Sequence, residues 1–203
     1  MREIDMSEPR PYPRRVTTEA GEIEFRLMTR ADEAAVLDFA QKLPTHDLLF
    51  LPRNISQPKV LSAWINEIER GDIVSLLALK GEVVVGCGTL VQDSHSWSPH
   101  VGEIRMVVSL DVRGKGVGRA LSQETFALAI GSGLEKLTVQ MTVDQQAAIA
   151  LFESLGFKAE ALLRDHVRDV AGKTHDIVVL GHNVAQVRAQ MEAYGLPGAV
   201  SPS

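Results

Sequence analysis

A glycine-rich segment near the middle of the chain, Arg113-Gly114-Lys115-Gly116-Val117-Gly118, constrains the fold more than any other feature. A β-rich run precedes it and a helical pattern follows it, so it predicts a tight turn from a strand into a helix. Glycines let such a turn bring its amide N–H groups close to a ligand, and the helix N-terminus adds a positive dipole. Arg113, Lys115 and Arg119 add positive charge in a chain whose net charge is -5. The segment therefore predicts an anion site suited to a pyrophosphate.

Two common phosphate-binding motifs do not fit this segment. A Walker loop needs Gly-Lys followed by Ser or Thr, but Gly116 follows Lys115. The dinucleotide fingerprint needs a further glycine three positions after the second, where Arg119 stands. These mismatches argue against a nucleotide-binding protein. A glycine-rich turn that carries solvated basic side chains is the alternative to a ligand site.

The periodicity of apolar residues predicts a series of strands and helices rather than a repeat array. Alternating apolar residues indicate strands, and apolar residues at helical spacing indicate helices, the first of them capped by Asp32. The predicted strands are 23–27, 75–79, 83–91, 100–109, 136–143, 157–169 and 174–183, and the predicted helices are 35–43, 59–70, 118–130 and 145–155. The predicted order is βααββ, then βαβα, then ββ.

Length and composition predict one domain, residues 22–184, between an N-terminal arm (1–21) and a C-terminal tail (185–203), with a short helix over 184–196. Hydrophobic residues make up 45% and charged residues 23%, the balance of a folded protein. The N-terminus is charged and bears prolines, and no apolar run reaches a membrane-spanning length, so we expect a cytoplasmic protein without a membrane partner. The acidic net charge argues against a nucleic-acid partner. The single cysteine, Cys87, is expected in the core.

Two motifs together make the chain resemble the GCN5-related N-acetyltransferase (GNAT) family. Arg113, Gly116 and Gly118 match its pattern of Arg or Gln, two residues, Gly, one residue, then Gly or Ala. A second family motif, Leu-Tyr-x-x-x-Gly-Phe at the end of a helix, is similar to residues 151–157, and the predicted element order agrees over residues 23–184. The resemblance implies an α/β (α+β) fold with a central mixed, mostly antiparallel sheet. The fourth and fifth strands (100–109 and 136–143) would splay apart, and helices would flank the sheet.

The resemblance also implies acetyl-CoA as cosubstrate, bound where the fourth and fifth strands separate, and no metal. The acceptor would be a primary amine of a small molecule or a protein. Residues 45–47 and 164–169 would line the acceptor-binding side. The same resemblance would allow a homodimer. The implied cofactor-binding residues are Met106, Val107 and Val108 through their backbone, Arg113, Gly114, Lys115, Gly116, Val117, Gly118 and Arg119 at the phosphates, and Gln145 and Phe152 on the later helix.

Acyl transfer to an amine needs a base, because an amine with a pKa of about 10.4 is mostly protonated at neutral pH. Glu103 is the candidate, because the resemblance places it on the fourth strand, upstream of the cofactor-binding residues. Strand alternation puts Glu103 and Arg105 on one face, so an exposed ion pair between them explains the same residues without catalysis. Both interpretations stay open at this point.

The chain departs from the family pattern where a proton donor is expected. The usual tyrosine, which is proposed to protonate the leaving thiolate, is Phe152, and the usual asparagine at the helix start is Gln145. Water or another donor such as His95, His166 or His175 would have to substitute, although each histidine is more often structural. Asp144 is interpreted as a helix N-cap. A non-catalytic acyl-CoA binding or sensing module is therefore the alternative function.

Overall fold

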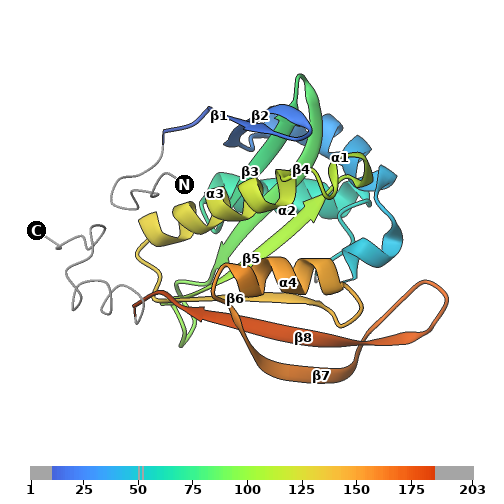
Figure 1. Ribbon diagram of the computed structural model, residues 1–203, viewed down its shortest axis with the longest axis vertical. Helices are drawn as coiled ribbons and strands as arrows, with labels where there is room; N and C mark the ends of the chain where they lie inside the picture. The colour runs from blue at the N-terminus through green and yellow to red at the C-terminus, as the bar shows by residue number, and fades with distance from the viewer. Residues whose placement is uncertain (1–10, 50, 52, 186–203) are drawn as a thin grey trace, which may run out of the picture.

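The computed structural model describes residues 11–49, 51 and 53–185, whose strands form one eight-stranded sheet (Figure 1). The strand order is β1-β2-β3-β4-β5-β6-β8-β7, and the neighbours are antiparallel except for the parallel pair β5 and β6. The strands are β1 (Arg14–Thr18), β2 (Gly21–Leu27), β3 (Ile73–Lys80), β4 (Val83–Gln92), β5 (Val101–Val108), β6 (Lys136–Thr142), β7 (Lys158–Arg168) and β8 (Thr174–Asn183). The helices are α1 (Glu33–Lys42), η2 (Thr45–Leu48), α2 (Pro58–Arg70), α3 (Val117–Gly131) and α4 (Gln146–Ser154), with short 3-10 turns η1 (Arg30–Asp32) and η3 (Leu110–Val112). The predicted mixed, mostly antiparallel sheet with flanking helices is confirmed.

Helices cover both faces of this sheet (Figure 1). Leu77 and Leu79 of β3 pack into a core with α1 and α2, whereas Leu76 and Ala78 pack into a second core with α3. This division follows from the strand period of two, which sends successive side chains to opposite faces. Helix α3 packs so closely on β4 that a Cβ added at Gly88 would collide with Thr125 Oγ1. The sheet is thus buried on both sides at its centre.

Strands β5 and β6 pair over only part of their length. Their parallel ladder ends at Ile104 and Val139, whereas β5 stays paired with β4 as far as Val108. The two strands therefore separate beyond Ile104, which confirms the predicted splay. Ser109 N donates to Val85 O of β4 at 2.9 Å. Because N–H directions alternate along a strand, Met106 and Val108 direct their backbone groups toward the gap.

Three sequence predictions need correction or lie outside the described residues. Residues 14–18 belong to the predicted arm but form β1, whose Val16 pairs with Ile23 of β2 across a short turn. Asp32 precedes α1 but makes no side-chain cap, because its carboxylate binds Arg26 and Thr29 instead. Residues 1–10, which belong to the predicted arm, lie outside the described residues. Residues 186–203, which hold most of the predicted tail and its helix, also lie outside them. Within the described ranges, no helix has the length and apolarity to cross a membrane.

Asp32 is a buried carboxylate that joins the end of β2 to the start of α1. Its oxygens accept from Arg26 Nη1 at 2.8 Å, Arg26 Nη2 at 2.6 Å and Thr29 N at 2.8 Å. The hydrogen bonds from the Arg26 guanidinium hold the pKa of Asp32 below its usual range. We expect Asp32→Asn to lower the free energy of unfolding at pH 7 by about 2 kcal/mol, measured by urea denaturation.

The pH dependence of this loss has a defined sign. The stabilisation by Asp32 is fully present above the carboxyl pKa of the unfolded chain, about 3.9, and disappears as the pH falls through the lower folded value. The wild-type protein and the Asp32→Asn variant should therefore converge in stability in strong acid. Asp38→Asn is the matched control, because the Asp38 side chain is 63% exposed and its pair with Lys42 is screened by solvent. An equal loss in both variants would contradict the role of burial.

Candidate functional site

A cavity of about 520 Å³ lies between the end of β5, the glycine-rich segment and the start of α4. We call it the Gly-loop cavity. Met106, Val107, Val108, Arg113, Gly114, Gly116, Gly118, Arg119 and Gln145 line it, together with Asp47, Asp144, Gln146, Ala147, Ala148 and Leu151. Most of the residues predicted for the cofactor site are thus brought to one cavity. Lys115, Val117 and Phe152 are not in its lining.

The glycine-rich segment adopts a conformation that suits an anion. Gly114 and Gly116 have φ values of 70° and 82°, in the left-handed region that glycine enters without strain. Gly116 is the N-cap of α3, and the first N–H groups of a helix have no partner within that helix. These amides and the helix dipole favour negative charge at the lining of the Gly-loop cavity.

The basic side chains of this segment are held by the protein itself. Arg113 donates to Val108 O through Nε at 3.2 Å and Nη2 at 3.0 Å, and it pairs with Asp47 of η2 at 2.7 Å. Lys115 Nζ donates to Asp111 O at 2.8 Å, and Arg119 Nη2 donates to Ser154 Oγ at 3.1 Å. Arg113 therefore ties the loop to β5 and η2. Asp47, predicted on the acceptor side, lines the Gly-loop cavity as the partner of Arg113.

The side chains at the start of α4 differ from the prediction. Gln145, not Asp144, is the N-cap residue of α4, and Gln145 Oε1 accepts from Thr142 N at 3.3 Å. Phe152 is 4% exposed, and its ring meets that of Phe157 edge-on at 5.2 Å. Phe152 and Gln145 share a small cavity of about 40 Å³ with Met106 and Met141 inside the splay. An apolar ring therefore lies beside the gap, where it offers no proton.

Glu103 lies on the face of β5 opposite Ile104 and beside Arg105. Its two oxygens accept from Arg105 Nε at 2.9 Å and Arg105 Nη2 at 3.0 Å, and both side chains are about one-quarter exposed. Both line a cavity of about 340 Å³, the Glu103 cavity, which Gln140 and His166 also line. The predicted ion pair with Arg105 thus exists. Glu103 nevertheless faces an open cavity, where a small molecule could approach its carboxylate.

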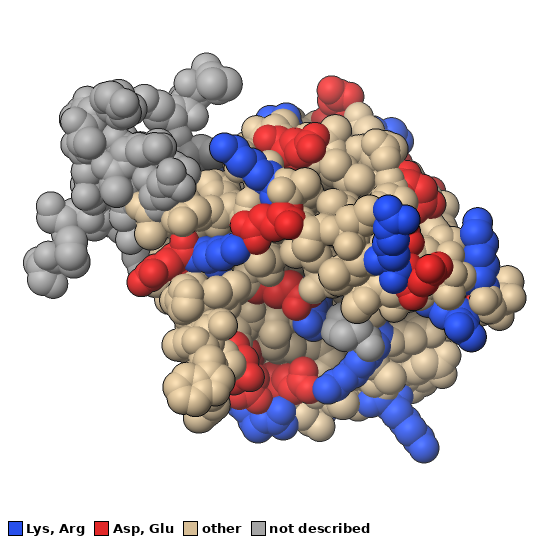
Figure 2. Space-filling view, turned by 90° about the horizontal axis from the view of Figure 1, so that it is seen from below, with Lys and Arg blue, Asp and Glu red and all other residues tan. Residues whose placement is uncertain are grey.

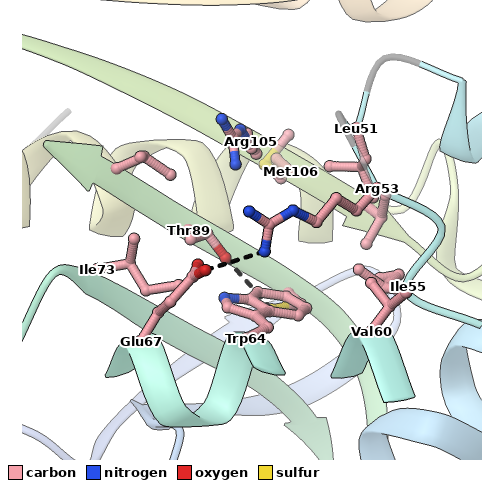
Figure 3. A pocket seen from close by; sticks show the side chains of 13 residues that line it. Leu51, Arg53, Ile55, Val60, Trp64, Glu67, Ile73, Thr89, Arg105 and Met106 are labelled. Carbon is pink, nitrogen blue, oxygen red and sulfur yellow. Dashed lines mark hydrogen bonds and ion pairs between the residues drawn. The ribbon is translucent and has the colours of Figure 1, made fainter. Parts of the chain in front are cut away.

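A further cavity, of about 330 Å³, lies between α2 and the sheet (Figure 3). We call it the Trp64 pocket. It shares Met106 and Val107 with the Gly-loop cavity, and Leu51 and Arg105 with the Glu103 cavity. Its other lining residues are Arg53, Ile55, Val60, Trp64, Glu67, Ile73, Cys87, Thr89 and Val91. The Trp64 pocket, the Gly-loop cavity and the Glu103 cavity therefore all border the second half of β5.

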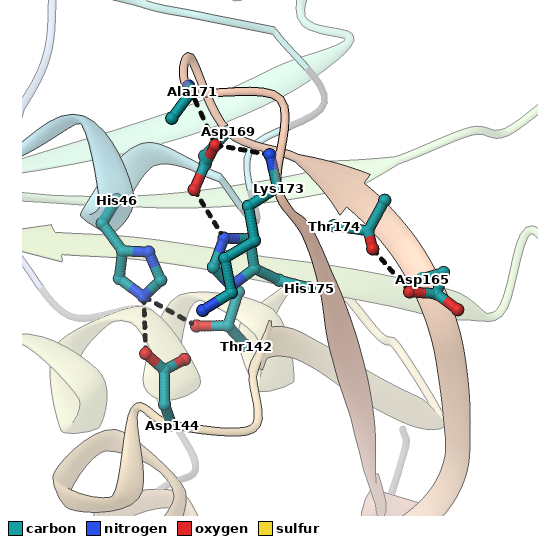
Figure 4. A network of polar contacts seen from close by, with 9 residues as sticks. All are labelled: His46, Thr142, Asp144, Asp165, Asp169, Ala171, Lys173, Thr174 and His175. Atoms are coloured by element: carbon teal, nitrogen blue, oxygen red, sulfur yellow. Dashed lines mark hydrogen bonds and ion pairs between the residues drawn. The ribbon is translucent and has the colours of Figure 1, made fainter.

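A polar network joins η2 to the end of β6 and the final hairpin (Figure 4). His46 Nε2 lies 2.8 Å from Asp144 Oδ2 and 3.5 Å from Thr142 Oγ1, and its ring meets that of His175 at 5.1 Å. A hydrogen bond with Thr142 and the nearby His46 hold the pKa of Asp144 below its usual range. His46 of the expected acceptor segment 45–47 thus contacts His175, which pairs with Asp169 of the other expected segment, 164–169.

The remaining candidates are dispersed. His175 pairs with Asp169 at 2.8 Å, His95 bonds Ser94 in an exposed loop, and His166 lines the Glu103 cavity. Cys87 is buried as predicted, and burial raises the pKa of its thiol to about 12. Trp97 is fully exposed. The described residues hold no group of three or more His, Cys, Asp or Glu side chains placed to bind a metal ion.

Comparisons with known proteins identify a family and similar folds. The sequence model of the Acetyltransferase (GNAT) family matches residues 39–157. N-acetylaspartate synthetase of Xenopus tropicalis is 28% identical over 57% of this chain, but the match spans only 36% of the synthetase. N-alpha-acetyltransferase 30 of Schizosaccharomyces pombe is 24% identical over 53% of this chain and 72% of its own length. The fold is similar to that of yncA from Salmonella typhimurium, solved with its cofactor acetyl-CoA, with a TM-score of 0.68 and 20% identity over 80% of this chain and 94% of that one.

Proposed function

The chain belongs to the GNAT acetyltransferase family, and from this premise we propose that it transfers an acetyl group from acetyl-CoA to a primary amine. The Gly-loop cavity is the observation that carries the proposal. It combines the first amides of α3, which have no partner within the helix, with the backbone edge of β5 beyond the end of its pairing with β6 at Ile104. Met106 and the N–H of Val108 would pair with the pantetheine, and the amides of Gly114 and of residues 116–119 would bind the pyrophosphate.

The proposed reaction is a direct transfer through a tetrahedral intermediate. The amine lone pair attacks the thioester carbonyl, a C–N bond forms, the C–S bond breaks and CoA leaves as thiolate. Glu103 takes the proton that the amine loses, directly or through water, because its carboxylate faces the cavity beside the splay. Water returns a proton to the thiolate, because Phe152 has none to give. The products are an N-acetyl amine and CoA.

The test is an acetyl-transfer assay with the purified chain, acetyl-CoA and a panel of primary amines. Mass spectrometry would follow the acetylated amine, and a thiol reagent would follow released CoA. The proposal expects the two products in equal amounts. Acetyl-CoA binding without thiol release for any acceptor would favour the alternative, an acyl-CoA binding or sensing module, which the apolar ring of Phe152 motivates.

Phe152→Tyr should increase the turnover number. The new hydroxyl would lie in the small cavity with Gln145, and a cavity of about 40 Å³ has room for an oxygen atom. If protonation of the thiolate limits the rate, kcat should rise about tenfold while the KM for acetyl-CoA stays constant. Steady-state kinetics with one amine would measure both constants.

Phe126→Tyr is the matched control for this gain. Phe126 lies on α3, stacked on His182 with ring centroids 5.1 Å apart, and is not in the lining of the Gly-loop cavity. It should leave kcat unchanged. A similar kcat in wild type and Phe152→Tyr would show that thiolate protonation is not the slow step.

A further inference from the structure

The Trp64 pocket is built from three parts of the chain. Val60, Trp64 and Glu67 lie on one side of α2, at a spacing that places them on one helix face. Strands β3 to β5 form the floor, where Thr89 Oγ1 and Ser75 Oγ lie 3.0 Å apart. Leu51, Arg53 and Ile55 form the third wall (Figure 3). The pocket thus lies beside β5 and has walls from all three parts of the chain.

The walls of the Trp64 pocket are mainly apolar. Aliphatic side chains line the pocket together with the indole of Trp64, namely Leu51, Ile55, Val60, Ile73 and Val91. Trp64 packs against the α1–α2 core at its edge rather than within it. An apolar cavity of roughly 150 Å³ already holds benzene, so this pocket of about 330 Å³ has room for an aromatic or branched aliphatic group.

Charged pairs lie at two sides of the Trp64 pocket. Arg53 and Glu67 form an ion pair at 2.9 Å, which joins residue 53 to α2 (Figure 3). Arg105 lies on the side shared with the Glu103 cavity and forms an ion pair with Glu103. Each arginine is neutralised by a carboxylate, so the pocket has no unbalanced positive charge to select an anion. The carboxylate of Glu103 lies where a cationic ammonium group could approach.

The occupant that fits this arrangement is a small molecule. The pocket has the volume of a small-ligand site, and the Arg53–Glu67 ion pair is part of its lining. A protein lysine would bring a long cationic chain without apolar bulk to fill the chamber. Lys and Arg side chains are interspersed with Asp and Glu on the face in Figure 2, so that face offers no extended charge of one sign to a macromolecule.

We propose that the Trp64 pocket binds the apolar body of the acceptor, and that the acceptor is a small primary amine with an aromatic or branched aliphatic group. This inference rests on the proposed acetyl transfer. The amine would lie at the β5 side of the pocket, where Arg105 is shared with the Glu103 cavity and Met106 with the Gly-loop cavity. Trp64 thus determines acceptor specificity without taking part in proton transfer.

Binding can be measured without turnover. The chain has two tryptophans, and Trp97 is fully exposed, so Trp97→Phe leaves Trp64 as the single indole reporter. In this variant, 2-phenylethylamine and 3-methylbutylamine should change the fluorescence in a saturable way, whereas spermidine should not. A change that does not saturate, or an equal response to spermidine, would overturn the proposal.

Kinetics provide the second arm of the test. Trp64→Ala should lower kcat/KM for 2-phenylethylamine at least about tenfold, mainly through KM, and leave methylamine within about twofold. Val60→Phe, which fills the pocket at a half-buried position, should act in the same direction and covers the case in which Trp64→Ala folds poorly. Trp97→Ala is the matched control and should change neither substrate.

The outcomes separate this inference from the proposed function. Saturable Trp64 fluorescence with no acetylated product for any amine would support the pocket and overturn acetyl transfer. The opposite result would be acetylation of amines that do not change the Trp64 fluorescence, with kcat/KM unchanged in Trp64→Ala and Val60→Phe. It would overturn the Trp64 pocket as the acceptor site and leave acetyl transfer in place.

Discussion

Gly118→Asp should weaken the binding of acetyl-CoA by about 100-fold or more, because like charges placed together cost several kcal/mol. Gly118 lines the Gly-loop cavity in the first turn of α3. An added Cβ would meet Leu151 Cδ2 at 3.8 Å and Val108 Cγ2 at 3.9 Å, which are ordinary contacts. The side chain therefore fits, and its carboxylate would occupy the region proposed for the pyrophosphate. Isothermal titration with acetyl-CoA would measure the loss.

The same substitution should not destabilise the protein. A carboxylate near a helix N-terminus is favourable by about 0.3–1 kcal/mol, so urea denaturation should show equal or greater stability. Gly118→Ala is the control that adds the Cβ without the charge, and it should lower the affinity much less. Unchanged affinity in Gly118→Asp would place the pyrophosphate elsewhere and contradict the proposed use of the glycine-rich segment.

The sequence predicts the strands and helices of the central sheet well because their apolar periods are strong. The predicted run 100–109 is β5 (Val101–Val108), and the predicted helix 118–130 is α3 (Val117–Gly131). Strand β1 was missed because it is an edge strand with little burial, so Arg14, Arg15 and Thr17 show no clear alternation. Its pairing with β2 depends on the turn that leads into Gly21. Gly21 has a φ of 102°, and patterns of apolar residues do not predict such a local conformation.

Side-chain partners that are distant in sequence were harder to predict. Glycine spacing located the loop, but the sequence does not reveal that Arg113 binds Asp47, 66 positions away. The pairing of His46 with Asp144 depends in the same way on how η2 packs against the end of β6. The sequence does not decide the place of Trp64, because an aromatic on a helix face fits a core, a surface or a pocket equally well. Only the positions of Leu51, Arg53 and Ile55 across from α2 make it a pocket wall.

Glu103→Gln should lower kcat by about 100-fold or more, the usual contribution of a general base. Glutamine keeps the size of the side chain and one acceptor for Arg105, which binds Glu103 through Nε at 2.9 Å. It removes the carboxylate that is proposed to take the amine proton. Without that base, only the neutral amine reacts, so kcat should rise about tenfold per pH unit toward the amine pKa of about 10.4. A pH-rate profile from pH 6 to pH 10 would measure this.

Arg105→Gln distinguishes catalysis from structure at this pair. The variant keeps the Glu103 carboxylate but removes the guanidinium that binds both of its oxygens. If Glu103 is the base, Arg105→Gln should mainly change the KM of the amine, because Arg105 lines the Trp64 pocket, and should keep the pH profile of the wild type. If Glu103 serves only to hold Arg105, both variants should lose activity equally with no change in pH dependence. The base role therefore predicts a much lower kcat for Glu103→Gln than for Arg105→Gln, whereas the structural role predicts equal losses.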